Sequence, residues 1–119
     1  MTGSNSKRVR VVFYQTATEV QPVRDWLRSL PPEDRWIVGQ DIKTLEMGWP
    51  IGMPVCRPLG GGLYEVRSSI RKGKVETRVY LAIEDGLAVL LHYQQGKAGQ
   101  DREIRQARKL LSDYRRRKQ

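Results

Sequence analysis

The second half of the chain carries four side chains suited to phosphate chemistry, namely Arg67, Arg78, His92 and Lys97. Guanidinium forks match phosphate oxygens, and an imidazole titrates near neutral pH, so it can give or take a proton. All four lie in or beside strand-like runs, and one antiparallel sheet would bring them together near one end. The pattern predicts a sheet that carries a phosphate-binding site.

Three strand-like runs make up that sheet: residues 62–67, 76–83 and 87–94. The first run places Glu65 and Arg67 on one face and Tyr64 and Val66 on the other. The second and third are rich in β-branched, aromatic and aliphatic residues, and the segment Glu84-Asp85-Gly86 between them is a tight-turn signal. These two runs are therefore predicted to form a hairpin.

A fourth strand is predicted near the start of the chain, from Lys7 to Tyr14, where basic and apolar residues alternate. Its inward-facing residues would be Val9, Val11 and Phe13. Arg8 and Arg10 would then face water, as in a sheet with one solvated side. This strand would add basic side chains to the polar face.

Apolar residues recur at helical spacing in two segments that follow this strand. The first helix is predicted from about Val20 to Leu30, with Pro22 in its first turn. The second starts at Pro31-Pro32-Glu33-Asp34 and ends at Gly48 as a left-handed cap. Their apolar stripes are Val23, Trp26, Leu27 and Leu30, then Val38, Ile42 and Leu45. We expect an antiparallel helix hairpin packed by Trp26, Trp36 and Trp49, with Tyr64 and Tyr80 in the core.

Residues 51–61 contain proline and glycine and are predicted to be a loop that brings Arg57 to the sheet. The next turn, Arg71-Lys72-Gly73-Lys74, is a basic hairpin tip. It is either solvated or able to grip a nucleic-acid backbone. A last helix should begin at Asp101, a suitable N-cap, and place Ile104, Ala107, Leu111 and Tyr114 on one face.

The composition favours a polyanionic partner. The 119 residues carry a net charge of +9, with a pI of about 10.1, which suits nucleic acid, an anionic membrane or an acidic protein. The length predicts one domain over residues 1–119, with disordered ends at 1–6 and 115–119. One cysteine and one histidine are too few for a typical zinc site, so we expect no metal and no cofactor. Without a secretory signal or a membrane-length apolar run, a cytoplasmic location is expected.

Five short segments within this order of elements carry a family resemblance: Pro58 to Arg67, Thr77 to Tyr80, Leu90-Leu91-His92, Lys97, and Glu103-Ile104 with Ala107. In order and spacing they resemble the RelE/HigB-type toxins of toxin–antitoxin modules, particularly their phage-derived branch. The resemblance implies a RelE-like α+β fold: an N-terminal strand, a helical hairpin, three antiparallel strands completing a four-stranded sheet, and a C-terminal helix. After Leu91-His92 that branch usually continues with Gly-Phe and two lysines, whereas this chain reads Tyr93-Gln94-Gln95-Gly96-Lys97.

The resemblance also implies an activity, that of an mRNA endoribonuclease that works on the ribosome, needs no metal and inhibits translation and growth. In that reaction the ribose 2′-hydroxyl attacks the adjacent phosphate. The site must therefore take a proton, stabilise a charged phosphorane and protonate the leaving oxygen. The implied partners are the ribosome, mRNA and a cognate antitoxin of helix-turn-helix type.

The candidate catalytic residues are Arg78, Arg67, Lys97, His92, Tyr93 and Glu65. Arg78 would stabilise charge in the transition state, or else be a surface arginine that pairs with Glu65. Arg67 and Lys97 would hold phosphate, and Lys97 could also be the acid. His92 could be acid or base, or a packed core residue.

Two further candidates depend on their neighbours. Tyr93 falls on the strand face opposite His92 unless a bulge intervenes. Glu65 is either a general base or a neutralising partner of Arg67.

Basic residues around the sheet are the expected RNA contacts, namely Lys74, Arg71, Lys72, Arg8, Arg10 and Arg57. Residues Arg115 to Lys118 would add affinity for ribosomal RNA as a tail. Two other functions remain open at this point. One is a non-catalytic nucleic-acid-binding regulator of phage or mobile-element origin, in which the same arginines only position the nucleic acid. The other is a scaffold that docks an acidic partner through the C-terminal helix.

Overall fold

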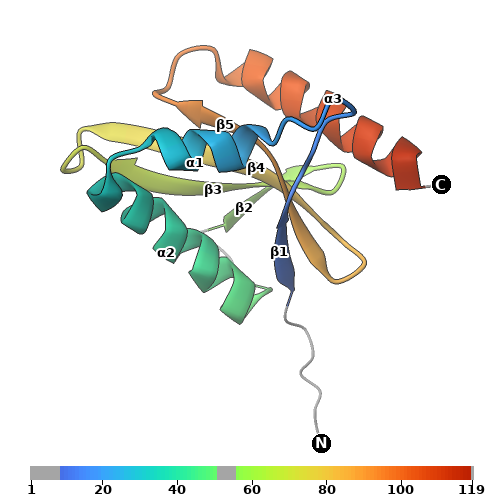
Figure 1. Ribbon diagram of the computed structural model, residues 1–119, viewed down its shortest axis with the longest axis horizontal. Helices are drawn as coiled ribbons and strands as arrows, with labels where there is room; N and C mark the ends of the chain where they lie inside the picture. The colour runs from blue at the N-terminus through green and yellow to red at the C-terminus, as the bar shows by residue number, and fades with distance from the viewer. Residues whose placement is uncertain (1–8, 51–55, 119) are drawn as a thin grey trace, which may run out of the picture.

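The computed structural model describes residues 9–50 and 56–118 (Figure 1). This part of the chain forms β1 (Arg10–Phe13), α1 (Pro22–Ser29), α2 (Pro32–Gly48), β2 (Cys56–Gly60), β3 (Leu63–Ile70), β4 (Val75–Glu84), β5 (Leu87–Gln95) and α3 (Gln100–Lys118). The strands form one sheet of order β1-β5-β4-β3-β2, in which only β1 pairs in parallel. The predicted α+β class is confirmed, but the sheet has five strands rather than four.

The hairpin of β4 and β5 is confirmed, and its turn chemistry explains it. Asp85 and Gly86 both have positive φ, at 53° and 76°. A two-residue turn of this kind matches the twist of the flanking strands, and Asp-Gly is among the sequences that adopt it most readily.

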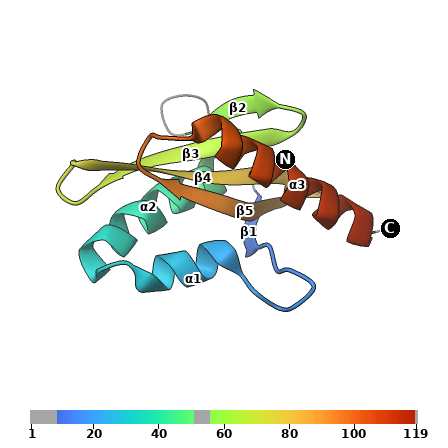
Figure 2. The same cartoon turned by 90° about the horizontal axis from the view of Figure 1, so that it is seen from above.

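Helices cover both faces of the sheet (Figure 2). On one face, α1 and α2 pack on Val66, Val79 and Leu81, together with other buried residues. On the other face, Ala107 and Leu111 of α3 belong to a second buried cluster; its strand members are Leu63, Tyr80, Ala82, Val89 and Leu91. Each strand therefore buries side chains in both directions, which explains why residues 79–83 of β4 form a continuous apolar run.

The register places two rows of side chains across the face that α3 covers. The first row is Arg57, Glu65, Tyr80 and His92, and the second row is Arg67, Arg78 and Gln94. Tyr80 pairs with His92 whereas Leu81 pairs with Leu90, so Leu91 is the extra residue of a bulge in β5. The bulge turns His92 toward α3.

The prediction for β1 is partly wrong. Phe13 was expected in the core, but it is 36% exposed, whereas the next residue, Tyr14, is buried. Val12 packs on the α3 side and Val11 on the other side, so this strand has no fully solvated face. Arg10 is exposed as expected, and Arg8 lies outside the described residues.

Three further local predictions fail for identifiable reasons. Part of the predicted 51–61 loop, Cys56–Gly60, is the edge strand β2; its Pro58 is tolerated because an edge position does not need every N–H. Gly48 ends α2 without a left-handed cap, since the following Trp49 is extended with φ −64°. Trp36 is 65% exposed, because the buried stripe of α2 runs through Val38 and leaves Trp36 on the other side of the helix.

The last helix differs from the prediction at both ends. It begins at Gln100, so Asp101 lies in its first turn rather than at the cap. Residues 115–118, expected to be disordered, are helical, and the carboxylates of Glu84, Asp85 and Asp113 pair with them. Arg115 and Lys118 reach the β4–β5 hairpin and therefore help to dock α3 instead of forming a free tail.

Tyr14 supplies a testable link between β1 and α3. Its Oη donates to Asp113 Oδ2 at 2.6 Å. This hydrogen bond, with help from Arg117, holds the pKa of the Asp113 carboxyl below its usual value of 3.8. A carboxyl whose pKa is lower in the folded chain stabilises the fold above its unfolded pKa, and that contribution is lost as the pH falls through the folded value.

We predict that Tyr14→Phe lowers the urea midpoint at pH 7 and that this difference from wild type shrinks as the pH is lowered through the usual carboxyl pKa of 3.8 and below it. Chemical unfolding followed by tryptophan fluorescence measures it. Tyr114→Phe is the matched control on α3, and it should show no such pH dependence. A Tyr14→Phe deficit that stays constant across this pH range would contradict the prediction.

Candidate functional site

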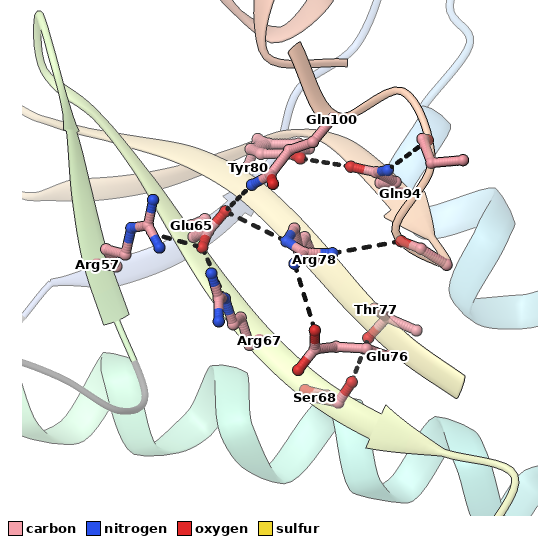
Figure 3. Close-up of polar contacts among 12 residues, drawn as sticks. Arg57, Glu65, Arg67, Ser68, Glu76, Thr77, Arg78, Tyr80, Gln94 and Gln100 are labelled. Carbon is pink, nitrogen blue, oxygen red and sulfur yellow. Dashed lines mark hydrogen bonds and ion pairs between the residues drawn. The ribbon is translucent and has the colours of Figure 1, made fainter. Parts of the chain in front are cut away.

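A buried carboxylate, that of Glu65 on β3, lies at the centre of the candidate site (Figure 3). Its Oε2 lies 2.8 Å from Arg67 Nε and 3.9 Å from Arg57 Nε, and its Oε1 lies 3.6 Å from Arg78 Nε. Gln100, the first residue of α3, donates from Nε2 to Oε1 at 3.3 Å. We call Arg57, Arg67 and Arg78 the arginine cluster.

Arg78 is the deepest member of the arginine cluster. It is 4% exposed, so the interpretation of Arg78 as a surface arginine is wrong. Its guanidinium contacts Glu76 Oε1 and the carbonyl of Gly96, each at 3.3 Å, in addition to Glu65. Within the described residues, its Nε has no hydrogen-bond partner. The pairing with Glu65 that the sequence left open is present, but in a buried setting.

Arg67 and Arg57 form the accessible rim of the cluster, with side chains 30% and 42% exposed. Arg67 stands directly opposite Arg78 on the neighbouring strand. Like charges in that position destabilise a sheet, and Glu65 offsets the repulsion only in part. Because stability alone does not favour two facing arginines, this pair indicates a functional role.

Hydrogen bonds of Tyr80 and Gln94 hold the segment between β5 and α3 in place. Tyr80 Oη donates to Gln94 Oε1 at 2.7 Å, and Gln94 Nε2 donates to the carbonyl of Ala98 at 2.9 Å. Burial, followed by the charge of Glu65, raises the pKa of Tyr80 to about 12, so its hydroxyl stays protonated at neutral pH. The predicted core placement of Tyr80 is confirmed. Lys97 lies in this segment and is exposed.

His92 and Tyr93 point to opposite sides of the sheet, as the strand alternation predicts. His92 Nε2 lies 2.6 Å from Glu103 Oε1 of α3. Tyr93 packs on the α1 side, where its ring stacks on Trp26 at 4.7 Å. The bulge precedes His92 and therefore does not bring Tyr93 to the same face.

His92 is also separated from Glu65. The two belong to one row but Tyr80 stands between them, which corresponds to two strand spacings, or roughly 10 Å. Together, Glu65, Arg67, Arg78 and Arg57 make one contiguous group. His92 lies at its edge, and Tyr93 lies outside it.

The expected RNA contacts are spread over the molecule. Arg71 is tied to α2, since its Nε lies 3.1 Å from Asp34 Oδ2. Lys72 and Lys74 are exposed at the same hairpin tip. Arg10 pairs with Leu87, at the opposite end of β5 from Gln94, roughly 23 Å away at strand spacing. Among the expected RNA contacts that the structure describes, only Arg57 joins the arginine cluster.

The sequence interpretation missed Glu76, Gln94, Gln100 and Glu103. Glu76 and Arg78 are two residues apart on one strand, so the alternation rule could have paired them. Gln100 and Glu103 reach the sheet from α3, and no local spacing rule reveals that. Cys56 is a poor nucleophile, because burial raises the pKa of its thiol to about 11.

Arg78 should matter more for stability than Arg67, because removing one partner of a buried ion pair leaves the other charge buried without a partner. We predict that Arg78→Ala lowers the free energy of unfolding by about 3 kcal/mol. The more exposed Arg67→Ala should lower it by about 1 kcal/mol. Urea unfolding of both variants measures the difference. Equal losses of unfolding free energy in the two variants would show that the burial of the Glu65 charge does not depend on Arg78.

Comparison with known proteins places the chain in a family. The family model described as "Phage derived protein Gp49-like (DUF891)" matches residues 25–112, about three quarters of the chain. No curated protein and no solved structure matches. Among the described residues, no helix has the length and apolar character needed to span a membrane. The matched range includes Glu65, Arg67, Arg78 and His92. The chain therefore belongs to the Gp49-like phage-derived family, a RelE/HigB-like toxin family of toxin–antitoxin systems.

Proposed function

We propose that this chain is the toxin of a toxin–antitoxin pair and that it cuts mRNA on the ribosome. The observation that carries the proposal is the arginine cluster around Glu65, with two guanidinium groups accessible and a third beneath them. Guanidinium groups that converge on one carboxylate are equally suited to a phosphate, which has the same kind of acceptor oxygens. Membership of a toxin family makes RNA the phosphate carrier to test first.

The proposed reaction is transfer within the RNA strand. A base takes the proton of the ribose 2′-hydroxyl, the 2′-oxygen bonds to phosphorus, and the bond from phosphorus to the 5′-oxygen breaks. An acid then donates a proton to that 5′-oxygen. The products are a 2′,3′-cyclic phosphate and a 5′-hydroxyl. No metal ion is needed, because the substrate supplies its own nucleophile and arginines can stabilise the phosphorane.

We assign the roles from the positions of the side chains. Arg67 and Arg57 receive the phosphate at the rim, and Arg78 stabilises the added charge from below. Glu65 on β3 and His92 on β5 flank Tyr80 in the row next to Arg78, so one can act as base and the other as acid on a phosphate held between them. Lys97, on the segment beside Arg78, is a further phosphate ligand or acid. Tyr93 receives no role in proton transfer, since it faces α1.

The partners follow from the charge of the molecule. The net charge of +9 and the exposed Lys72 and Lys74 favour docking on ribosomal RNA. A cognate antitoxin, proposed to be of helix-turn-helix type, would block the site by placing acidic or apolar residues over Arg57 and Arg67. Such a partner would compete with RNA for the same guanidinium groups.

Binding without catalysis is the second candidate. It is favoured by one observation, namely that Glu65 is fully buried and already paired with the arginine cluster, so the base must be uncovered before it can act. In that case the arginines would only position a nucleic acid. The two candidates differ in whether RNA is broken.

Induced expression separates them. We predict that producing this chain alone arrests bacterial growth and shortens messages only during translation, and that the fragments end in 2′,3′-cyclic phosphate. Primer extension and end-group analysis measure this. Intact messages in cells that contain folded protein would support the binding candidate and contradict the nuclease.

Arg67 offers a cleaner test of the chemistry than Arg78, because its loss should leave the fold intact. We predict that Arg67→Ala lowers the cleavage rate on programmed ribosomes about a hundredfold, the scale for losing one donor to a developing charge. Arg105→Ala, an exposed arginine on α3, is the matched control and should retain the wild-type rate. Equal cleavage rates for the wild type, Arg67→Ala and Arg105→Ala would show that the arginine cluster takes no part in the mechanism.

A further inference from the structure

A cleft of about 540 Å³ opens along the outer edge of β5, between α3 and the segment that leads into α1. β1 pairs with β5 only as far as Leu90, so within the described part of the chain the end of β5 is paired with β4 on one edge and has no strand on the other. The polar lining includes His92, Gln95, Glu103 and Gln106, and the apolar lining includes Pro22 and Leu110. The volume is large enough for a planar heterocycle of nucleobase size.

The charge of the cleft is opposite to that of the arginine cluster. Glu103 lines it, and no lysine or arginine of the described residues does so. A phosphate there would meet the carboxylate of Glu103, whose partner is His92, with no permanently charged cation in the lining, which is unfavourable. A neutral group with N–H donors would instead satisfy Glu103. The arginine cluster is therefore suited to a phosphate, and the cleft to a neutral base, of the same nucleotide chain.

The two sites adjoin each other across the segment between β5 and α3. Arg78 pairs with Gln94 on neighbouring strands and contacts the carbonyl of Gly96. Two residues further on, the carbonyl of Ala98 accepts a hydrogen bond from Gln94 Nε2, and Ala98 lines the cleft. An RNA strand that crosses this segment would pass over Lys97 and present a phosphate on one side and a base on the other.

We propose that the cleft beside β5 binds a nucleobase next to the phosphate held by the arginine cluster, and that it selects guanine through Glu103. This proposal rests on the proposed RNA-cleaving function and adds a base preference to it. Unpaired bases in single-stranded RNA are read through hydrogen bonds on their Watson–Crick edges, so an open cleft on the toxin can read one.

Guanine is the base whose edge fits the carboxylate. Its N1–H and N2–H2 groups are adjacent donors and match the two oxygens of Glu103. Oε1 is already in contact with His92, but a carboxylate oxygen can accept more than one hydrogen bond. Gln95 can complete the recognition. Its Oε1 accepts from Trp26 Nε1 at 3.0 Å, which leaves the NH2 group to donate to O6 of guanine.

The test uses the full chain and three trinucleotides, ApGpA, ApIpA and ApApA, with 2′-O-methyl groups that block cleavage. His92 is the one histidine of the chain, so its ring signals in NMR report on the cleft without ambiguity. We expect ApGpA to bind at least about tenfold more tightly than ApApA, the scale of one bidentate base contact. ApIpA, which lacks the N2 amino group, should lie between them.

Variants then assign the preference to Glu103. Glu103→Gln should reduce the ratio of guanine to adenine affinity to near one, while Asp101→Asn, an exposed carboxylate in the same helix, should leave the ratio unchanged. Thermal unfolding of both variants checks their folding. Glu103→Asp, which keeps the charge on a shorter side chain, is the second variant and should weaken guanine binding without reversing the preference.

Several outcomes would overturn the proposal: equal affinities for the three trinucleotides, a preference that survives Glu103→Gln, no movement of the His92 signals at millimolar trinucleotide, or movement only on adding an antitoxin segment. The last would make the cleft a protein-docking groove. Because the assay needs neither cleavage nor ribosomes, a guanine preference without message cleavage would count against the nuclease and not against the base site.

Discussion

The buried charge of Glu65 is the constraint on which the site depends. A carboxylate removed from water is strongly destabilising unless cations and hydrogen-bond donors surround it. Here those groups come from different elements: Arg57 from β2, Arg78 from β4 and Gln100 from α3, with Arg67 from β3 itself. One carboxylate thus ties three strands and the last helix together. It also holds the guanidinium groups in one place before any substrate arrives.

α3 serves both the core and the site. Its apolar face closes one side of the sheet, while its first turn brings Gln100 to Glu65 and Glu103 to His92. Its basic side chains dock the helix: Arg108 donates to the carbonyls of Leu59 and Gly60, and Arg115 pairs with Glu84. Arg108 and Arg115 are therefore engaged in packing, whereas Arg102, Arg105 and Lys109 are exposed and add to the basic surface that the rim of the arginine cluster and the hairpin tip offer to RNA.

Much of the fold could be read from the sequence, because its signals are local. The β4–β5 hairpin follows from its Asp-Gly turn, and the apolar face of α3 from its spacing. β2 could not, because a short edge strand with proline and glycine has the composition of a loop. The site shows the same division. Strand alternation placed Glu65 beside Arg67, but the burial of Arg78 depends on its contacts with Glu65, Glu76 and Gly96, which only the folded chain brings together.

The most direct test of the account is a cryo-EM structure of this protein on a ribosome whose message carries a 2′-O-methyl group at the point of attack. We predict that the scissile phosphate lies within hydrogen-bond distance of the guanidinium groups of Arg67 and Arg78, with Glu65 beside the blocked 2′-oxygen. A message phosphate held elsewhere, for example at the hairpin tip of residues 71–74, with Arg67 still closed on Glu65, would contradict it.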